Sequence, residues 1–323
     1  MFAKLSTWLL VVCLAVWATS ALAKAPAAQP KPAGKTQASR PAWLPAPAPA
    51  TAAAKDVVAF EQDGSIVLLD GQAKPERLDK GKDPALAPDA SLLVYSPEKR
   101  LGLRFVDLTK PGRQTRSTTT AMPIREKCFS PDGSRLAWRT DTSIQLFDPR
   151  QPLERPTTLI AGLAPDQTLQ GFTQDGTALV VRDLKHVTWY GLDGAIRRQE
   201  PIGKFTDDPL ASSGDASLPS PTDPNLLLVS CAVPPTPAYS QWAHDTSAAL
   251  FLYDAASGTN FRLTPPAFVA VDPAWSPDGR RIYFAGLPES PADGTHHIYR
   301  INADGSGLTE IARGLHPCVG SRP

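Results

Sequence analysis

A short hairpin sequence recurs along this chain, and its recurrence limits the folds that the chain can adopt. It reads Trp-Ser-Pro-Asp-Gly at 275–279, Phe-Ser-Pro-Asp-Gly at 129–133 and Phe-Thr-Gln-Asp-Gly at 172–176. Two eroded copies lie at 87–95 and 220–229. Successive turn aspartates are 43, 43, 48 and 55 residues apart: Asp89, Asp132, Asp175, Asp223 and Asp278. Repeats of this period made of strand-like units indicate a propeller or a solenoid.

Each copy predicts a β-hairpin. Pro277 fixes φ at the first central position of a type I turn, Asp278 suits the second, and Gly279 takes the left-handed conformation that follows. The apolar residues 282–284 then fit a buried strand. A second strand pair follows in each unit, most clearly around the turn at 302–306. Four short strands joined by tight turns form one propeller blade.

The two ends of the chain supply the remaining strands. An outer pair at 57–60 and 66–69 precedes the first hairpin unit, and an inner strand at 316–323, which aligns with 272–277, follows the fifth. Pairing these segments gives a sixth blade of three strands and removes exposed sheet edges. We therefore expect an all-β, six-bladed propeller closed by pairing of the amino- and carboxy-terminal strands. A five-bladed ring with frayed ends is the alternative.

These hairpins, followed by Ile-Tyr-x4-Asp-Gly strands, resemble the repeats of TolB-type (WD40-like) propellers of the bacterial envelope, over residues 57–323. The resemblance implies the fold and a place in the cell envelope, but a fold does not fix a function. TolB carries an α/β domain ahead of its propeller that contributes to its work in the Tol-Pal system. Residues 24–55 leave no room for such a domain, so the chain resembles a TolB propeller without it, which argues against a literal Tol-Pal role.

The amino-terminal segment predicts export. Residues 1–23 combine a positive start, an apolar core and a small-x-small cleavage site, as in a signal peptide, which places the protein in the periplasm. Two alternatives remain. Residues 5–23 are nearly long enough to anchor an uncleaved chain in the inner membrane. Cys13 lies in a sequence resembling a lipoprotein box, although the preceding valine is too large.

Between this segment and the propeller, residues 24–55 consist mainly of Ala, Pro, Lys, Gln and Thr, with Trp43 and Leu44 as the large apolar exceptions. Such a stretch buries too little surface to fold, and its prolines favour extended conformations. We expect a disordered linker that spaces the propeller, residues 56–323, from a membrane or through a wall.

Composition and motifs argue against several function classes. The 33 Lys and Arg balance 32 Asp and Glu, so no global field attracts nucleic acid or an anionic membrane. Gly-x-Ser-x-Gly, a phosphate loop and a dinucleotide fingerprint do not occur. We expect no catalytic residues and no cofactor. Three cysteines follow the signal segment, and we expect them to be largely buried, inert thiols: Cys128, Cys231 and Cys318.

His316 is the candidate for a metal site, because it lies on an innermost strand and propeller lyases acting on acidic sugars hold metal through histidines at the ring centre. The other histidines do not share its position, and the neighbours His296 and His297 face opposite ways on a strand. Turn bonding already explains the repeat aspartates. We find no convergence of His, Asp or Glu at equivalent blade positions. The sequence therefore predicts no metal site and favours binding over catalysis.

Loop length indicates where a partner binds. The long connections all fall on the face that carries the inter-blade links, where binding residues concentrate: 203–217, 232–247 and 286–295. In the blade-four loop, Tyr239, Trp242 and His244 are amphipathic anchors. We expect an exported, non-enzymatic scaffold that binds an envelope protein through them. The alternatives are a lyase or hydrolase acting on a sugar or peptide at the channel mouth, and a small-ligand or glycan binder.

Overall fold

The structure is a computed structural model of the chain, and it describes residues 40–46, 56–71, 73–151, 156–206, 212, 214–234, 247–288 and 294–322. The chain divides into two units, Met1–Arg40 and Pro41–Pro323. All that follows concerns the second unit.

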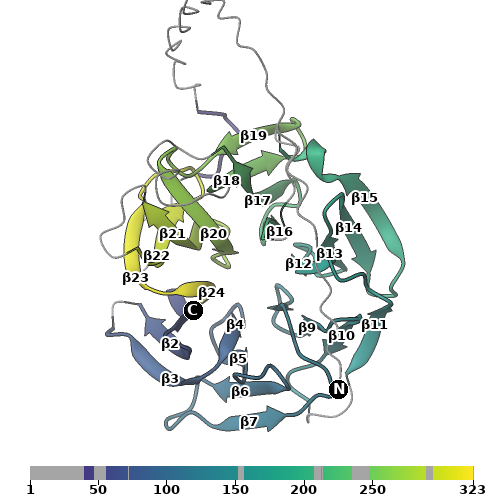
Figure 1. The fold of residues 1–323 in the computed structure, drawn as a ribbon, viewed down its shortest axis with the longest axis vertical. Helices are drawn as coiled ribbons and strands as arrows, with labels where there is room; N and C mark the ends of the chain where they lie inside the picture. Colours follow the sequence, from purple (N-terminus) through teal and green to yellow (C-terminus); the bar gives the residue numbers. More distant parts are fainter. Residues whose placement is uncertain are drawn as a thin grey trace, which may run out of the picture. The chain divides into compact units, whose positions relative to one another are not determined.

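Six four-stranded antiparallel sheets form a ring of blades (Figure 1). Blade 1 contains β4 (Lys82–Leu86), β5 (Leu92–Ser96), β6 (Leu103–Asp107) and β7 (Thr115–Thr118), and blade 2 contains β8 (Lys127–Phe129), β9 (Leu136–Arg139), β10 (Ser143–Phe147) and β11 (Thr157–Ala161). Blade 3 contains β12 (Thr168–Phe172), β13 (Ala178–Arg182), β14 (His186–Gly191) and β15 (Ile196–Pro201), followed by the short helix η2 (Ile202–Lys204). Blade 4 contains β16 (Ala216–Pro219), β17 (Leu226–Val233), β18 (Ser247–Asp254) and β19 (Thr259–Arg262), and blade 5 contains β20 (Phe268–Trp275), β21 (Arg281–Pro288), β22 (His297–Asn302) and β23 (Thr309–Arg313). Blade 6 joins β24 (Leu315–Ser321) to β1 (Asp56–Gln62), β2 (Ser65–Asp70) and β3 (Glu76–Lys80).

Blade 6 closes the ring, which confirms the expected six-bladed propeller. The last strand, β24, pairs antiparallel with β1, with Val58 opposite Val319. The expected number of strands in this blade was wrong, because β3 adds a fourth. Its sequence, Glu-Arg-Leu-Asp-Lys, is charged and its side chains are exposed or half-buried. An outer edge strand faces solvent and has no apolar pattern that the sequence reveals.

The repeated turns have the expected geometry. Gly133, Gly176 and Gly279 have φ of 68°, 68° and 66°, so each occupies the left-handed region. In the last of these turns Asp278 Oδ1 accepts hydrogen bonds from the Ser276 hydroxyl at 2.6 Å and from a backbone N–H at 3.1 Å. The carboxylates therefore hold the turns, which confirms their structural role.

A buried ion pair fixes the start of β1. The Asp56 carboxylate accepts hydrogen bonds from Arg281 Nε at 2.7 Å, Arg281 Nη2 at 3.0 Å and the Tyr283 hydroxyl at 2.7 Å. The Asp56 and Arg281 side chains are 1% and 2% exposed. Since both β21 partners belong to blade 5, this network ties the first propeller strand to the preceding blade.

Residues 41–46, which the composition predicts to be linker, contact the propeller. The Trp43 Nε1–H donates to Thr259 Oγ1 in β19 at 3.1 Å. Leu44 is buried in a cluster formed mainly by blades 4 and 5, which includes Leu252 and Ile282. The rest of the expected linker, residues 24–39 and 47–55, and the expected signal segment lie outside the described residues.

Candidate functional site

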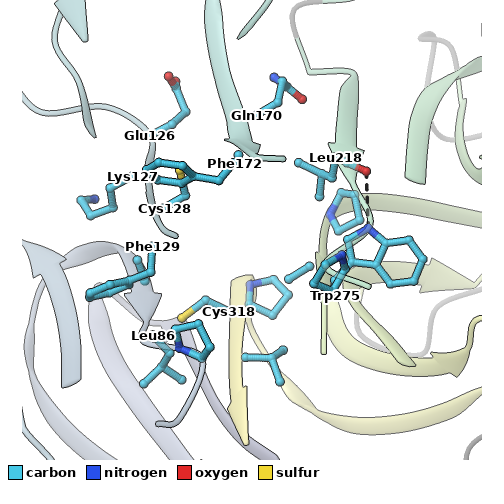
Figure 2. Close-up of a pocket in the computed structure, with 18 of the residues that line it drawn as sticks. Leu86, Glu126, Lys127, Cys128, Phe129, Gln170, Phe172, Leu218, Trp275 and Cys318 are labelled. Carbon is cyan, nitrogen blue, oxygen red and sulfur yellow. Dashed lines mark hydrogen bonds between the residues drawn. The ribbon is translucent and has the colours of Figure 1, made fainter. Parts of the chain in front are cut away.

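A cavity of about 430 Å³ occupies the centre of the ring, and the inner strand of every blade contributes to its wall (Figure 2). Towards the Ser-Pro-Asp-Gly turns the wall is apolar and includes Leu86, Phe129, Phe172 and Trp275. At the opposite end, where the inner strands begin, the lining residues are mainly charged or polar. We call this end the channel mouth.

Four ionisable residues lie at the mouth, at equivalent positions of four blades: Asp83, Glu126, Asp272 and His316. The prediction that no such residues converge was wrong. Their spacing in the sequence could have revealed this convergence. The first three lie six positions before the turn aspartates Asp89, Asp132 and Asp278. His316 occupies the same place in the terminal strand that aligns with blade 5. The erosion of the first repeat and the lack of a turn after the last strand conceal this pattern.

Backbone bulges position three of these side chains. Asp83, Asp272 and His316 have φ of 50°, 51° and 49°, a region that non-glycine residues seldom adopt. Each lies where the pairing register shifts and each precedes a proline. Bulges of this kind redirect side chains and are common beside functional sites. The local sequence therefore orients the ionisable groups at the mouth.

His316 is held as an imidazolium. Its Nδ1 lies 3.0 Å from Asp272 Oδ2. Burial acts to lower the pKa of His316, but the hydrogen bond and charge of Asp272, with the charges of Glu61 and Asp83, raise that pKa to about 9. The potential ligand atoms of Glu61, Asp83 and His316 lie within 4.8 Å of one another. Because this group includes a protonated imidazole, and because Arg100 Nη2 lies 3.0 Å from Asp83 Oδ2, it forms an ion-pair cluster and fits a metal ion poorly.

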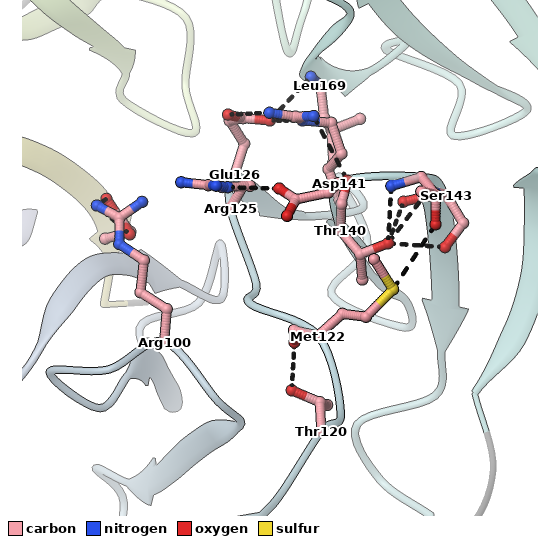
Figure 3. Close-up of polar contacts among 12 residues, drawn as sticks. Arg100, Thr120, Met122, Arg125, Glu126, Thr140, Asp141, Ser143 and Leu169 are labelled. Atoms are coloured by element: carbon pink, nitrogen blue, oxygen red, sulfur yellow. Dashed lines mark hydrogen bonds and ion pairs between the residues drawn. The ribbon is translucent and has the colours of Figure 1, made fainter. Parts of the chain in front are cut away.

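Glu126 belongs to a second cluster, on the side of the mouth formed by blades 2 and 3 (Figure 3). Its carboxylate accepts a 2.6 Å hydrogen bond from Arg139 Nε and a 3.3 Å hydrogen bond from the backbone N–H of Leu169. Beside it, Arg125 Nε donates to Asp141 Oδ1 at 2.9 Å. The carboxylate therefore accepts hydrogen bonds from both blade 2 and blade 3.

Two kinds of reactive side chain line the channel without an evident catalytic arrangement. Lys127 donates from Nζ to the Asp83 carbonyl at 2.6 Å, and burial lowers the pKa of Lys127 to about 8. Burial raises the pKa values of Cys128 and Cys318 to about 12, so both remain thiols. Cys231 is buried, as expected, whereas Cys128 and Cys318 are only half-buried.

Polar contacts cross all six junctions between neighbouring blades around the channel. We call them the inter-blade belt. Starting at blade 6, they are Glu61 Oε1 with Asp83 N–H (2.6 Å), Lys127 Nζ with the Asp83 carbonyl (2.6 Å), Glu126 Oε2 with Leu169 N–H (3.3 Å), Gln170 Oε1 with Ser217 N–H (2.6 Å), the Leu218 carbonyl with Trp275 Nε1–H (3.4 Å), and Asp272 with His316 (3.0 Å).

The partner-binding residues expected from the sequence, Tyr239, Trp242 and His244, lie outside the described residues. The flanking strand ends do show on which face their loop begins. Val233 and Ser247 are paired at the end of blade 4 that contains Ala216, where the inner strand starts. The expected loop face and the channel mouth therefore coincide. His297 lies away from the cavity lining, with its Nδ1 2.8 Å from Glu310 Oε1.

Structural comparison supports the fold. The chain is similar to TolB from Acinetobacter baumannii, with a TM-score of 0.57 and 18% identity over 82% of this chain and 66% of that protein. It is also similar to a putative TolB from Agrobacterium tumefaciens (TM-score 0.55, 14% identity, 83% and 99% coverage) and to a protein of unknown function from Bacteroides caccae (0.52, 12%, 82% and 98%). The chain thus spans just under two thirds of the Acinetobacter protein. No family model matches the sequence, and no curated protein matches it significantly.

These similarities establish a TolB-type propeller fold. Within the described residues, no helix is long and apolar enough to cross a membrane.

Proposed function

We propose that this protein is an exported, non-enzymatic propeller that binds another protein of the cell envelope at its channel mouth. The long loops of the same face, with Tyr239, Trp242 and His244, would add contacts around the mouth. Export rests on the signal-like residues 1–23. A periplasmic chain that begins after Ala23 supports this part of the proposal, and a membrane-bound chain that retains residues 5–23 contradicts it.

The observation that carries the proposal is the combination of a paired ionic rim and an apolar channel wall. The mouth carboxylates Asp83, Glu126 and Asp272 are each engaged by a basic side chain, so none is free to act alone as a general base. Below them the residues that line the cavity include aromatic ones such as Phe129 and Trp275. A polar rim around an apolar centre is the usual anatomy of a protein interface.

Affinity capture from solubilised envelope tests the proposal. Phe129→Gln places a polar group in the half-buried channel wall, and Ile196→Gln makes the same kind of change on β15, where the side chain is 56% exposed. We expect the wild-type chain and the Ile196 variant to capture the same protein and the Phe129 variant to lose it. Equal capture by all three excludes the channel as the binding site. A Tyr239→Ala/Trp242→Ala chain tests the loop separately.

A second candidate is a lyase or hydrolase acting on a sugar or peptide at the mouth. The His316–Asp272 pair favours it, because a carboxylate that orients an imidazole is a common acid–base arrangement. Turnover of acidic oligosaccharides or peptides that is lost in His316→Gln, with folding retained, supports this candidate. Absence of turnover together with capture of a partner rejects it.

A further inference from the structure

The amino-terminal arm, which we define as residues 41–46, binds the rim of the ring through two side chains. Trp43 reaches β19 through the 3.1 Å hydrogen bond from its Nε1–H to Thr259 Oγ1. Leu44 is 8% exposed, whereas Ala42 and Ala46 on either side are exposed. The arm folds into a turn, with the Leu44 N–H 3.3 Å from the Pro41 carbonyl. This alternation of buried and exposed residues is typical of a docked segment.

The surface under the arm is formed by two blades. Trp43 and Leu44 join an apolar cluster whose partly buried members include Phe261 of β19 in blade 4 and Leu308, just before β23 in blade 5. Trp43 and Leu44 are the large apolar side chains of the 24–55 stretch, and both are used in this contact. The flanking prolines restrict the free arm, which reduces the entropy lost on docking.

The strand register places the arm on the face opposite the channel mouth. Thr259 pairs with Asp254, which pairs with Leu226, at the end of blade 4 where the inner strand finishes. Leu308 likewise follows the β22–β23 turn, at the end of blade 5 where β20 finishes with Trp275. The mouth residues lie at the other end of the blades, where the inner strands begin.

We propose that Trp43 and Leu44 form an anchor that fixes the arm on the apolar surface shared by blades 4 and 5, at the face opposite the mouth. The occupant of this surface is the chain's own Trp-Leu segment. The anchor leaves the mouth unobstructed, a consequence that rests on the proposed function.

Thiol labelling of full-length variants tests the anchor. Leu44→Cys and Ala46→Cys place a thiol at a buried and at an exposed position of the same arm, so local sequence and unfolding affect both alike. We expect Leu44→Cys to react with a disulfide reagent at least about ten-fold more slowly than Ala46→Cys. Adding Trp43→Ala should bring the two rates together, and Thr259→Val should bring them partly together. The native cysteines give a slow background that the parent chain measures.

Equal rates at positions 44 and 46 in the parent arm overturn the proposal, as does a difference that Trp43→Ala leaves unchanged. An unchanged melting temperature shows that the propeller remains folded in each variant. The experiments can contradict the anchor proposal and the binding proposal independently. Loss of partner capture in Phe129→Gln with arm labelling unchanged concerns the channel wall alone, and altered arm labelling with normal capture concerns the anchor alone.

Discussion

Separating the partners of the buried Asp56–Arg281 pair should strongly destabilise the propeller. Replacing Asp56 with leucine removes the acceptor of two Arg281 hydrogen bonds and of the Tyr283 hydroxyl. Arg281, 2% exposed, then keeps Asp278 at 3.1 Å, a carboxylate that is 38% exposed. Leaving a buried charge without its partner costs about 3–5 kcal/mol. At about 2–4 °C per kcal/mol, the melting temperature should fall by roughly 10 °C.

The double variant Asp56→Leu/Arg281→Met provides the control. It removes both charges, so the main loss should be the acceptor of the Tyr283 hydroxyl, a cost of about 1–2 kcal/mol. Urea unfolding of the parent, both single variants and the double variant gives the coupling energy between the two side chains. The reasoning is refuted if either single variant loses less than about 1 kcal/mol, or if the double variant loses the sum of the singles.

Three further outcomes are expected. The raised pKa of His316 implies a contribution to folding stability that is fully present below pH 6.5 and is lost as the pH rises through about 9. The difference in urea midpoint between the parent and His316→Gln should therefore disappear over that pH range. A difference that stays constant contradicts the ion pair. Gly258→Ala should lower the free energy of unfolding by about 1–2 kcal/mol, because the backbone φ of 68° is unfavourable for alanine although the space around it is open. Gly279→Ala should lower it further, because the added methyl group would meet a neighbouring threonine. Equal denaturant midpoints for the two variants would show that this threonine moves aside. Cys128 and Cys318, which are half-buried and have pKa values raised to about 12, should react with a disulfide reagent at neutral pH far more slowly than in urea. Comparable rates would show that the fold does not shield these two thiols.

The sequence predicts the ring well because the residues of each turn determine the local hairpin geometry on their own. Even the eroded first repeat forms the turn, with Ala90 at a φ of 56° where the three intact copies have glycine. The strand β3 was missed because an exposed edge strand has no apolar period. The convergence at the mouth was missed because the residues come from separate repeats, and comparing the repeats position by position would have revealed it. Trp43 and Leu44 show the limit of composition, because their contacts come from blades 4 and 5, and Thr259 lies 216 residues after Trp43 in the sequence.

The inter-blade belt bears on how readily the channel can change its width. Each blade is joined to both of its neighbours, so one blade cannot tilt outward without breaking polar contacts at two junctions. Such a wall resists widening, and a segment that is too broad gains no room by pushing one blade aside. A channel of this kind would have a nearly fixed width, and any segment that binds in it would have to fit that width without help from a shift of the blades.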